Sequence, residues 1–208
     1  MKYPELACEL SALLIQDQRE VKALARLGLS TGDSQDYAEQ KLTTQRLVAK
    51  RMRRAREILR EVHLPLLSNI GRDGCLALSV LALHASLGDL EIVLRAFERC
   101  FDLNKEDCAY DLIPAMRDWL LIHQGQPQEF GAQWLFDQDN YPFLPTVARF
   151  TTYGELNARR AAYGREPLHW PKSLVMSDDE QPWLKRPIAE AVMRMPTTDE
   201  LERVISKR

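Results

Sequence analysis

Histidine is the side chain best suited to acid–base chemistry at neutral pH. The sequence holds four, His63, His84, His123 and His169, and no two are spaced as the zinc ligands of an H-E-x-x-H helix. His84 lies inside the apolar stretch CLALSVLALHASLG, where a buried imidazole needs a hydrogen-bonding partner. Two interpretations of His84 follow: a histidine with only a structural role, or a general acid or base.

A second candidate is the polar segment IHQGQPQEFGAQW, residues 122–134, with four glutamines. Amide side chains donate and accept hydrogen bonds but do not titrate, so they suit the recognition of polar groups. We expect Gln128 and Gln133 to line the same polar cleft as His84, since Phe130 should draw the segment inward. The alternative is a loop whose glutamines hold an irregular main chain in place.

A third candidate is the stretch from Lys41 to Arg60, which contains eight basic residues and one acidic residue. The basic residues are Lys41, Arg46, Lys50, Arg51, Arg53, Arg54, Arg56 and Arg60. This face can be solvated or internally paired, can bind an acidic protein partner through Arg53 and Arg54, or can bind nucleic acid. Nucleic acid is the weakest of these interpretations, because no aromatic residues interleave with the basic ones to stack on bases.

The cysteines, Cys8, Cys75, Cys100 and Cys108, form no C-x-x-C pair. We expect them to be small buried side chains in a reducing cytosol, and we expect no metal and no cofactor. No signal sequence and no apolar run of the roughly 18 residues that a membrane helix needs are found. The sequence therefore predicts a cytoplasmic protein with no membrane contact.

The apolar spacing predicts helices over 3–27, 35–62, 75–88, 89–101 and 105–124, with Gly28 ending the first and Asp89 capping the fourth. After Gly125 the pattern predicts two short strands, about 132–136 and 142–147, joined by the turn DQDN. Thr152 and Glu155 then form a capping box for a helix that ends near Tyr163.

These elements predict a mainly α fold. A chain of 208 residues with 45% hydrophobic residues can build one core domain, which we place at residues 1–174, with a small β-hairpin. Residues 175–208 begin with an acidic linker and form a C-terminal helical appendage. The formal net charge of -2 gives no general attraction for nucleic acid or anionic lipid.

Several short pieces of the chain resemble, in the same order, an uncharacterised bacterial family of domains of unknown function (number 6624) with a Gln-x-Tyr-Gly-Thr-Gln signature. The pieces are LLIQDQREV, LALHAS, RDWLLIHQGQPQEFGAQ and NARRAAYGREPL. The resemblance implies a site made of Asp17, Gln18, His84, Asp118, Gln128, Gly131, Gln133, Arg159 and Arg160. The chain departs from the pattern at Phe130 and Ala132, where two hydroxyl groups are lost, and at Trp119, which replaces an arginine.

Such a set of carboxylates, amides, imidazole and guanidinium groups implies a polar cleft that binds an anionic or polar small ligand, as in a hydrolase or transferase. His84 would be the acid or base, oriented by Asp17 or Asp118. Gln18, Gln128, Gln133, Arg159 and Arg160 would bind the ligand. The alternative is a non-enzymatic protein-binding module, such as an immunity or adaptor protein.

Overall fold

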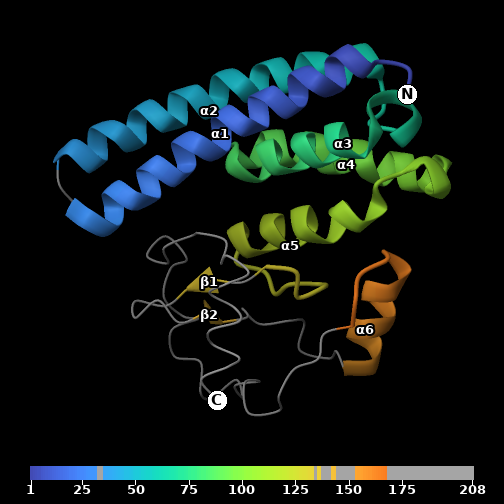
Figure 1. The fold of residues 1–208 in the computed structure, drawn as a ribbon. Coiled ribbons are helices and arrows are strands. Elements are labelled where there is room, and N and C mark those ends of the chain that lie inside the picture. Colours follow the sequence, from blue (N-terminus) through green and yellow to red (C-terminus); the bar gives the residue numbers. More distant parts are fainter. Residues whose placement is uncertain (32–34, 134, 137–141, 144–152, 168–208) are drawn as a thin grey trace. The chain divides into compact units, whose positions relative to one another are not determined.

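The computed structural model describes residues 1–31, 35–133, 135–136, 142–143 and 153–167 (Figure 1). The predicted mainly α fold is confirmed, since this part of the chain contains six α-helices. The chain divides into two compact units, Met1–Met116 and Arg117–Arg208. This division was not predicted, and the expected boundary between residues 174 and 175 lies outside the described residues.

The first unit is built on two long antiparallel helices, α1 (Pro4–Thr31) and α2 (Gln35–Val62), which lie side by side (Figure 1). The bounds of α2 are the predicted ones. The prediction that Gly28 ends α1 is wrong, because the helix continues to Thr31. A glycine within a helix costs only about 1 kcal/mol relative to alanine, so it need not end one.

The next helix, α3 (Leu67–His84), begins earlier than predicted because the helical path starts before a kink at Gly71. Gly71 has a φ of 68°, and a Cβ there would lie 2.9 Å from the Met1 sulfur. Glycine therefore suits both the conformation and the space.

The helix α4 (Leu87–Leu103) starts at a different cap from the one predicted. Ser86 is the N-cap, and its hydroxyl oxygen accepts the main-chain N–H of Asp89 at 3.2 Å. The Ser86 hydroxyl in turn donates to the Asp89 carboxylate at 2.7 Å. The prediction of Asp89 as the N-cap is wrong, because this reciprocal pair places Asp89 in the first turn of the helix.

The predicted helix over 105–124 is present only in its second half, as α5 (Ile113–His123). Two single 3-10 turns precede it, η1 (Lys105–Asp107) and η2 (Tyr110–Leu112). Pro114 lies in the first turn of α5, where its missing N–H breaks no helical hydrogen bond.

The core of the first unit lies where α1 to α4 meet. Each helix contributes fully buried apolar side chains, among them Leu10, Ile58, Leu78, Leu90 and Phe97. Three of the cysteines, Cys75, Cys100 and Cys108, are buried as predicted and all four are free thiols, whereas Cys8 is exposed. Among the described residues, no helix combines the length and apolar character needed to cross a membrane.

The second unit contains the last turns of α5, the strands β1 (Leu135–Phe136) and β2 (Pro142–Phe143), and α6 (Tyr153–Ala162). The strands pair antiparallel, with Leu135 opposite Phe143. The predicted hairpin is not confirmed, because only two residues of each strand pair. Ala132 and Gln133 lie outside β1, since their N–H groups bond to side chains, and the predicted turn and residues 144–147 lie outside the described residues.

Candidate functional site

In the first unit, Asp17 and His84 lie in contact, and both were predicted to take part in acid–base chemistry. Asp17, in the middle of α1, is fully buried, and its Oδ2 lies 2.5 Å from Nδ1 of His84. His84 is the last residue of α3, and its side chain keeps 24% of its surface exposed. The buried carboxylate thus holds one ring nitrogen, while Nε2 has no hydrogen-bond partner among the described residues.

Arg51 of α2 completes the environment of Asp17. Its Nη1 lies 3.2 Å from Asp17 Oδ1, and its Nη2 pairs with the carboxylate of Glu20. The Arg51 side chain is only 6% exposed. Because a buried charge needs a partner of opposite sign, this guanidinium compensates the Asp17 carboxylate inside the unit.

This geometry selects one tautomer of His84. A carboxylate can only accept a hydrogen bond, so Nδ1 of His84 must carry the proton in the contact with Asp17. Neutral His84 then has its lone pair on Nε2, which is the arrangement of a general base held by an acidic orienting residue. The carboxylate would also stabilise the imidazolium formed when Nε2 takes up a proton.

The second unit uses its buried carboxylate differently. Asp118, on α5, is fully buried, and its two oxygens accept main-chain N–H groups from Glu129 at 2.8 Å, Phe130 at 3.0 and 3.2 Å, and Ala132 at 2.7 Å. Burial raises the pKa of Asp118 to about 6, against the opposing effect of these hydrogen bonds. The carboxylate therefore serves as the acceptor for a loop that forms no ladder there.

The glutamines of the polar segment hold the same loop, which we call the Asp118 loop (residues 128–133). Gln128 Nε2 donates to the main-chain oxygen of Gln133 at 3.0 Å, and the Gln133 N–H donates to Gln128 Oε1 at 2.8 Å. Both residues are buried, and Gly131 between them has a φ of 60°. The amide of Gln128 closes the bend, and its predicted role in ligand binding stays a prediction.

Arg160, on α6, donates to a carbonyl group of this loop and to one beyond α6. Its Nη1 donates to the main-chain oxygen of Phe130 at 2.9 Å, and its Nε donates to that of Glu166 at 2.8 Å. The Phe130 ring packs edge-on against Tyr163, with centroids 5.1 Å apart. The segment is thus a folded loop in which several main-chain groups bond to buried side chains, and Arg160 holds peptide carbonyls where an anionic ligand was expected.

The structure brings the predicted residues together in two separate groups. Asp17 and His84 meet in the first unit, and Asp118, Gln128, Gln133 and Arg160 meet in the second. Gln18 is half-buried beside Asp17 in α1, and Arg159 is half-buried in α6. The single cleft shared by both groups, and the ligand-binding roles of Gln18, Gln133 and Arg159, stay predictions. Arg51 and Glu20 were not predicted.

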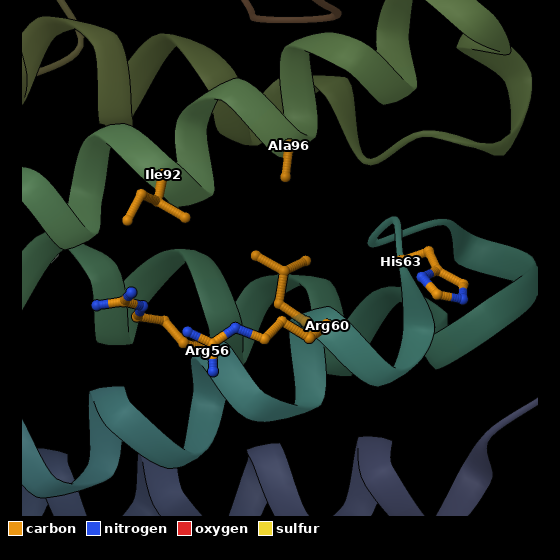
Figure 2. Close-up of a pocket in the computed structure, with 6 residues that line it drawn as sticks. Arg56, Arg60, His63, Ile92 and Ala96 are labelled. Atoms are coloured by element: carbon orange, nitrogen blue, oxygen red, sulfur yellow. The ribbon is translucent and has the colours of Figure 1, made fainter.

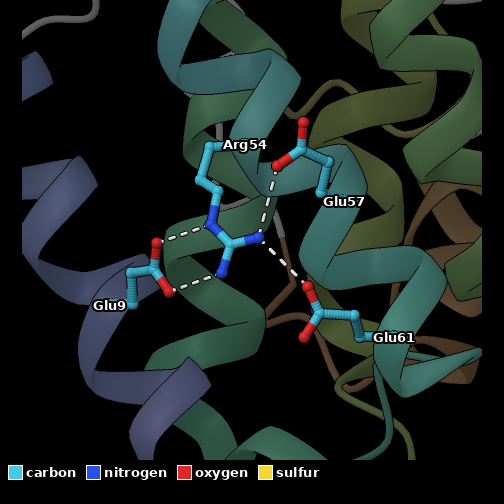
Figure 3. A network of polar contacts seen from close by, with 4 residues as sticks. All are labelled: Glu9, Arg54, Glu57 and Glu61. Atoms are coloured by element: carbon cyan, nitrogen blue, oxygen red, sulfur yellow. Dashed lines mark hydrogen bonds and ion pairs between the residues drawn. The ribbon is translucent and has the colours of Figure 1, made fainter.

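Three of the eight basic residues of the α2 face, Arg51, Arg54 and Arg56, form ion pairs within the first unit. Arg54 binds Glu9 through Nε at 2.6 Å and Nη2 at 2.9 Å, and its Nη1 lies 3.3 Å from Glu57 and 3.0 Å from Glu61 (Figure 3). Arg56 pairs with Asp89 at 2.9 Å. The prediction that Arg54 binds an acidic protein is therefore corrected, since its guanidinium already holds three carboxylates.

Among the described residues, no three His, Cys, Asp or Glu side chains gather as metal ligands would. No protein-family model, no curated protein and no solved structure matches the chain. Membership of the bacterial family that the sequence resembles therefore stays a prediction.

Proposed function

We propose that the first unit binds a polar or anionic small ligand at His84 and that His84 transfers protons to or from it, as in a hydrolase or transferase. The observation that carries the proposal is the hydrogen bond between buried Asp17 and Nδ1 of a partly exposed His84. The bond holds the ring by Nδ1, and the side chain is 24% exposed, so the ring can be reached by a ligand.

Each side chain has a distinct role in this proposal. Nε2 of His84 accepts a proton from a ligand hydroxyl or a water molecule and returns it to the leaving group. Asp17 is a positioning residue that holds the imidazole by Nδ1 and stabilises its protonated form. Arg51 is a positioning residue for Asp17, because it occupies the second carboxylate oxygen.

The tautomer of His84 tests the proposal before any ligand is known. Nitrogen NMR of the full chain should show Nδ1 protonated and Nε2 unprotonated at a pH where His84 is neutral. In Asp17→Asn the amide can donate to Nδ1, so the proton should move to Nε2. A wild-type spectrum with the proton on Nε2 contradicts the role of His84 as a base.

Ligand binding is tested with a panel of nucleotides, sugar phosphates and dicarboxylates, read out as a rise in melting temperature. At least one compound should stabilise the wild type but not His84→Gln, which keeps the size of the side chain and removes the titrating ring. His123→Gln, on α5 of the second unit, is the matched control and should respond like the wild type. Equal responses of His84→Gln and the wild type to every compound would contradict the proposal.

A further inference from the structure

An open groove of about 410 Å³ lies between α2 and α4 of the first unit (Figure 2). It is lined by Arg56, Leu59, Arg60, His63, Ile92 and Ala96. None of these residues belongs to the Asp17–His84 pair, so an inference about the groove does not rest on the proposed function of His84.

The groove has an apolar strip from both helices. Leu59 of α2 is buried, whereas Ile92 of α4 is 44% exposed and Ala96 is half-buried. In Figure 2, Ile92 and Ala96 project from α4 toward α2. Ile92 and Ala96 are one helical turn apart, so together they present a continuous apolar edge to the solvent.

The rims of the groove carry unneutralised positive charge. Arg60 is exposed and has no acidic partner among the described residues, and the same holds for Arg53, which lies one turn before Arg56 on the same side of α2. Arg99, one turn after Ala96 on α4, is likewise exposed without an ion pair in the described part of the chain. Only Arg56 is neutralised, by Asp89.

Three acidic residues of these two helices are held by arginines outside the groove lining. Glu57 and Glu61 both bind Arg54, and Glu91 pairs with Arg95 along α4. The groove therefore combines an exposed apolar strip with arginines that lack carboxylates, although the whole chain has a net charge of -2.

We propose that this groove binds an acidic amphipathic helix of a partner protein. Two helices side by side leave a channel into which the ridge of a third helix fits, and Ile92, Ala96 and Leu59 would receive its apolar stripe. Carboxylates on either side of that stripe would pair with Arg53, Arg60 and Arg99. A small anion would satisfy the arginines but would leave Ile92 in water.

The groove also provides a defined surface for the alternative function, a non-enzymatic protein-binding module. It replaces the partner site first expected at Arg53 and Arg54. Arg53 stays in the proposed site, and Arg54 does not, because its guanidinium is held by three carboxylates.

The test is a selection on the immobilised full chain from a library of helical peptides. The library fixes leucine at positions spaced three and four residues apart and varies the flanking positions among Glu, Lys, Gln and Ala. We expect the selected peptides to be enriched in Glu over Lys at the flanking positions. Arg60→Glu should weaken the best peptide by about tenfold or more, and exchange of its Glu residues for Lys should restore binding to that variant.

Matched variants separate the groove from general stickiness. Ile92→Asp should abolish peptide binding, whereas Leu76→Asp, at an exposed leucine outside the groove lining, and Arg46→Glu, at an exposed arginine earlier in α2, should leave it unchanged. Melting temperatures of all variants should stay near that of the wild type. No enrichment, enrichment in Lys, or equal loss in Leu76→Asp overturns the proposal. Binding to phosphatidylserine vesicles that needs Ile92, without selected peptides, also overturns it in favour of a lipid surface.

Discussion

Asp17 and Asp118 are both fully buried carboxylates on helices, yet they do different work. Asp17 bonds to two side chains, Arg51 and His84, and one of these keeps a free nitrogen near the surface. Asp118 bonds only to main-chain N–H groups of the Asp118 loop. The difference between the two carboxylates therefore lies in their partners, which are side chains for Asp17 and the main chain for Asp118.

Arg51 and Arg160, the arginines near these two carboxylates, differ in the same way. Arg51 neutralises carboxylates inside the first unit, whereas Arg160 donates to peptide carbonyls of the Asp118 loop in the second. In the second unit, Asp118 of α5 accepts from three N–H groups of one irregular segment, and Arg160 of α6 donates to a carbonyl group of the same segment. Residues that look like a polar site in the sequence can thus be the hydrogen-bond supports of a loop.

The largest expected effect comes from removing the partner of Asp17. Arg51→Leu leaves the Asp17 carboxylate buried with no guanidinium, and should lower the free energy of unfolding by about 3–5 kcal/mol. Denaturant unfolding measures the loss. The double variant Asp17→Asn with Arg51→Leu should recover part of it, because the uncompensated charge is gone. A loss no larger in Arg51→Leu than in Lys50→Leu, at the exposed neighbouring position, contradicts the importance of the pair.

The next effect is on the Asp118 loop. Asp118→Ala removes the acceptor of four hydrogen bonds and should destabilise the second unit by on the order of 3 kcal/mol. Asp118→Asn should cost less, because it keeps one carbonyl oxygen and removes a buried charge. Hydrogen exchange at the amides of Glu129, Phe130 and Ala132 gives a direct measurement. Unchanged protection in Asp118→Ala would show that the loop does not depend on this carboxylate.

The helices were the part of the fold most accessible from sequence. Apolar spacing predicted α2 correctly, because its buried residues recur every three or four positions along one face. Turn chemistry was less accessible: Ser86 and Asp89 are both good caps, and only the hydrogen-bond geometry assigns the role to Ser86. The prediction of the hairpin was wrong for a related reason. The Ala132 N–H donates to Asp118 on α5 and so does not pair with a neighbouring strand.

The candidate site was only partly accessible, because its contacts are long-range. Asp17 and His84 are 67 residues apart, and no local pattern joins them. Arg51 did carry a signal that the sequence analysis missed. It lies on the buried stripe of α2 with Val48, Ala55 and Ile58, at spacings of three, four and seven residues. A charged residue on an apolar stripe predicts a buried partner of opposite charge. The exposed arginines of α2 carry no such signal.

A smaller effect concerns pH. Burial raises the pKa of Asp118 to about 6 from a usual value of 3.8, so the folded state favours the neutral acid. The stability contributed by Asp118 is thus complete below about pH 4 and is lost as the pH rises through 6. The wild type should lose stability relative to Asp118→Asn over this range. If the wild type gains stability relative to Asp118→Asn instead, the four hydrogen bonds outweigh burial.

The smallest effect separates two neighbouring arginines of α2. Arg54→Glu places a fourth carboxylate beside Glu9, Glu57 and Glu61, and should lower the melting temperature clearly, more so at low salt. Arg53→Glu, at an exposed position with no ion pair in the described residues, should leave the melting temperature nearly unchanged, because isolated surface charges contribute little. The same variant should still weaken binding of an acidic helix to the groove. Equal melting temperatures of the two variants would mean that the contacts of Arg54 are as dispensable as those of any solvated side chain. The distinction between paired Arg54 and Arg53, unpaired in the described part of α2 and its neighbours, would then have no effect on stability.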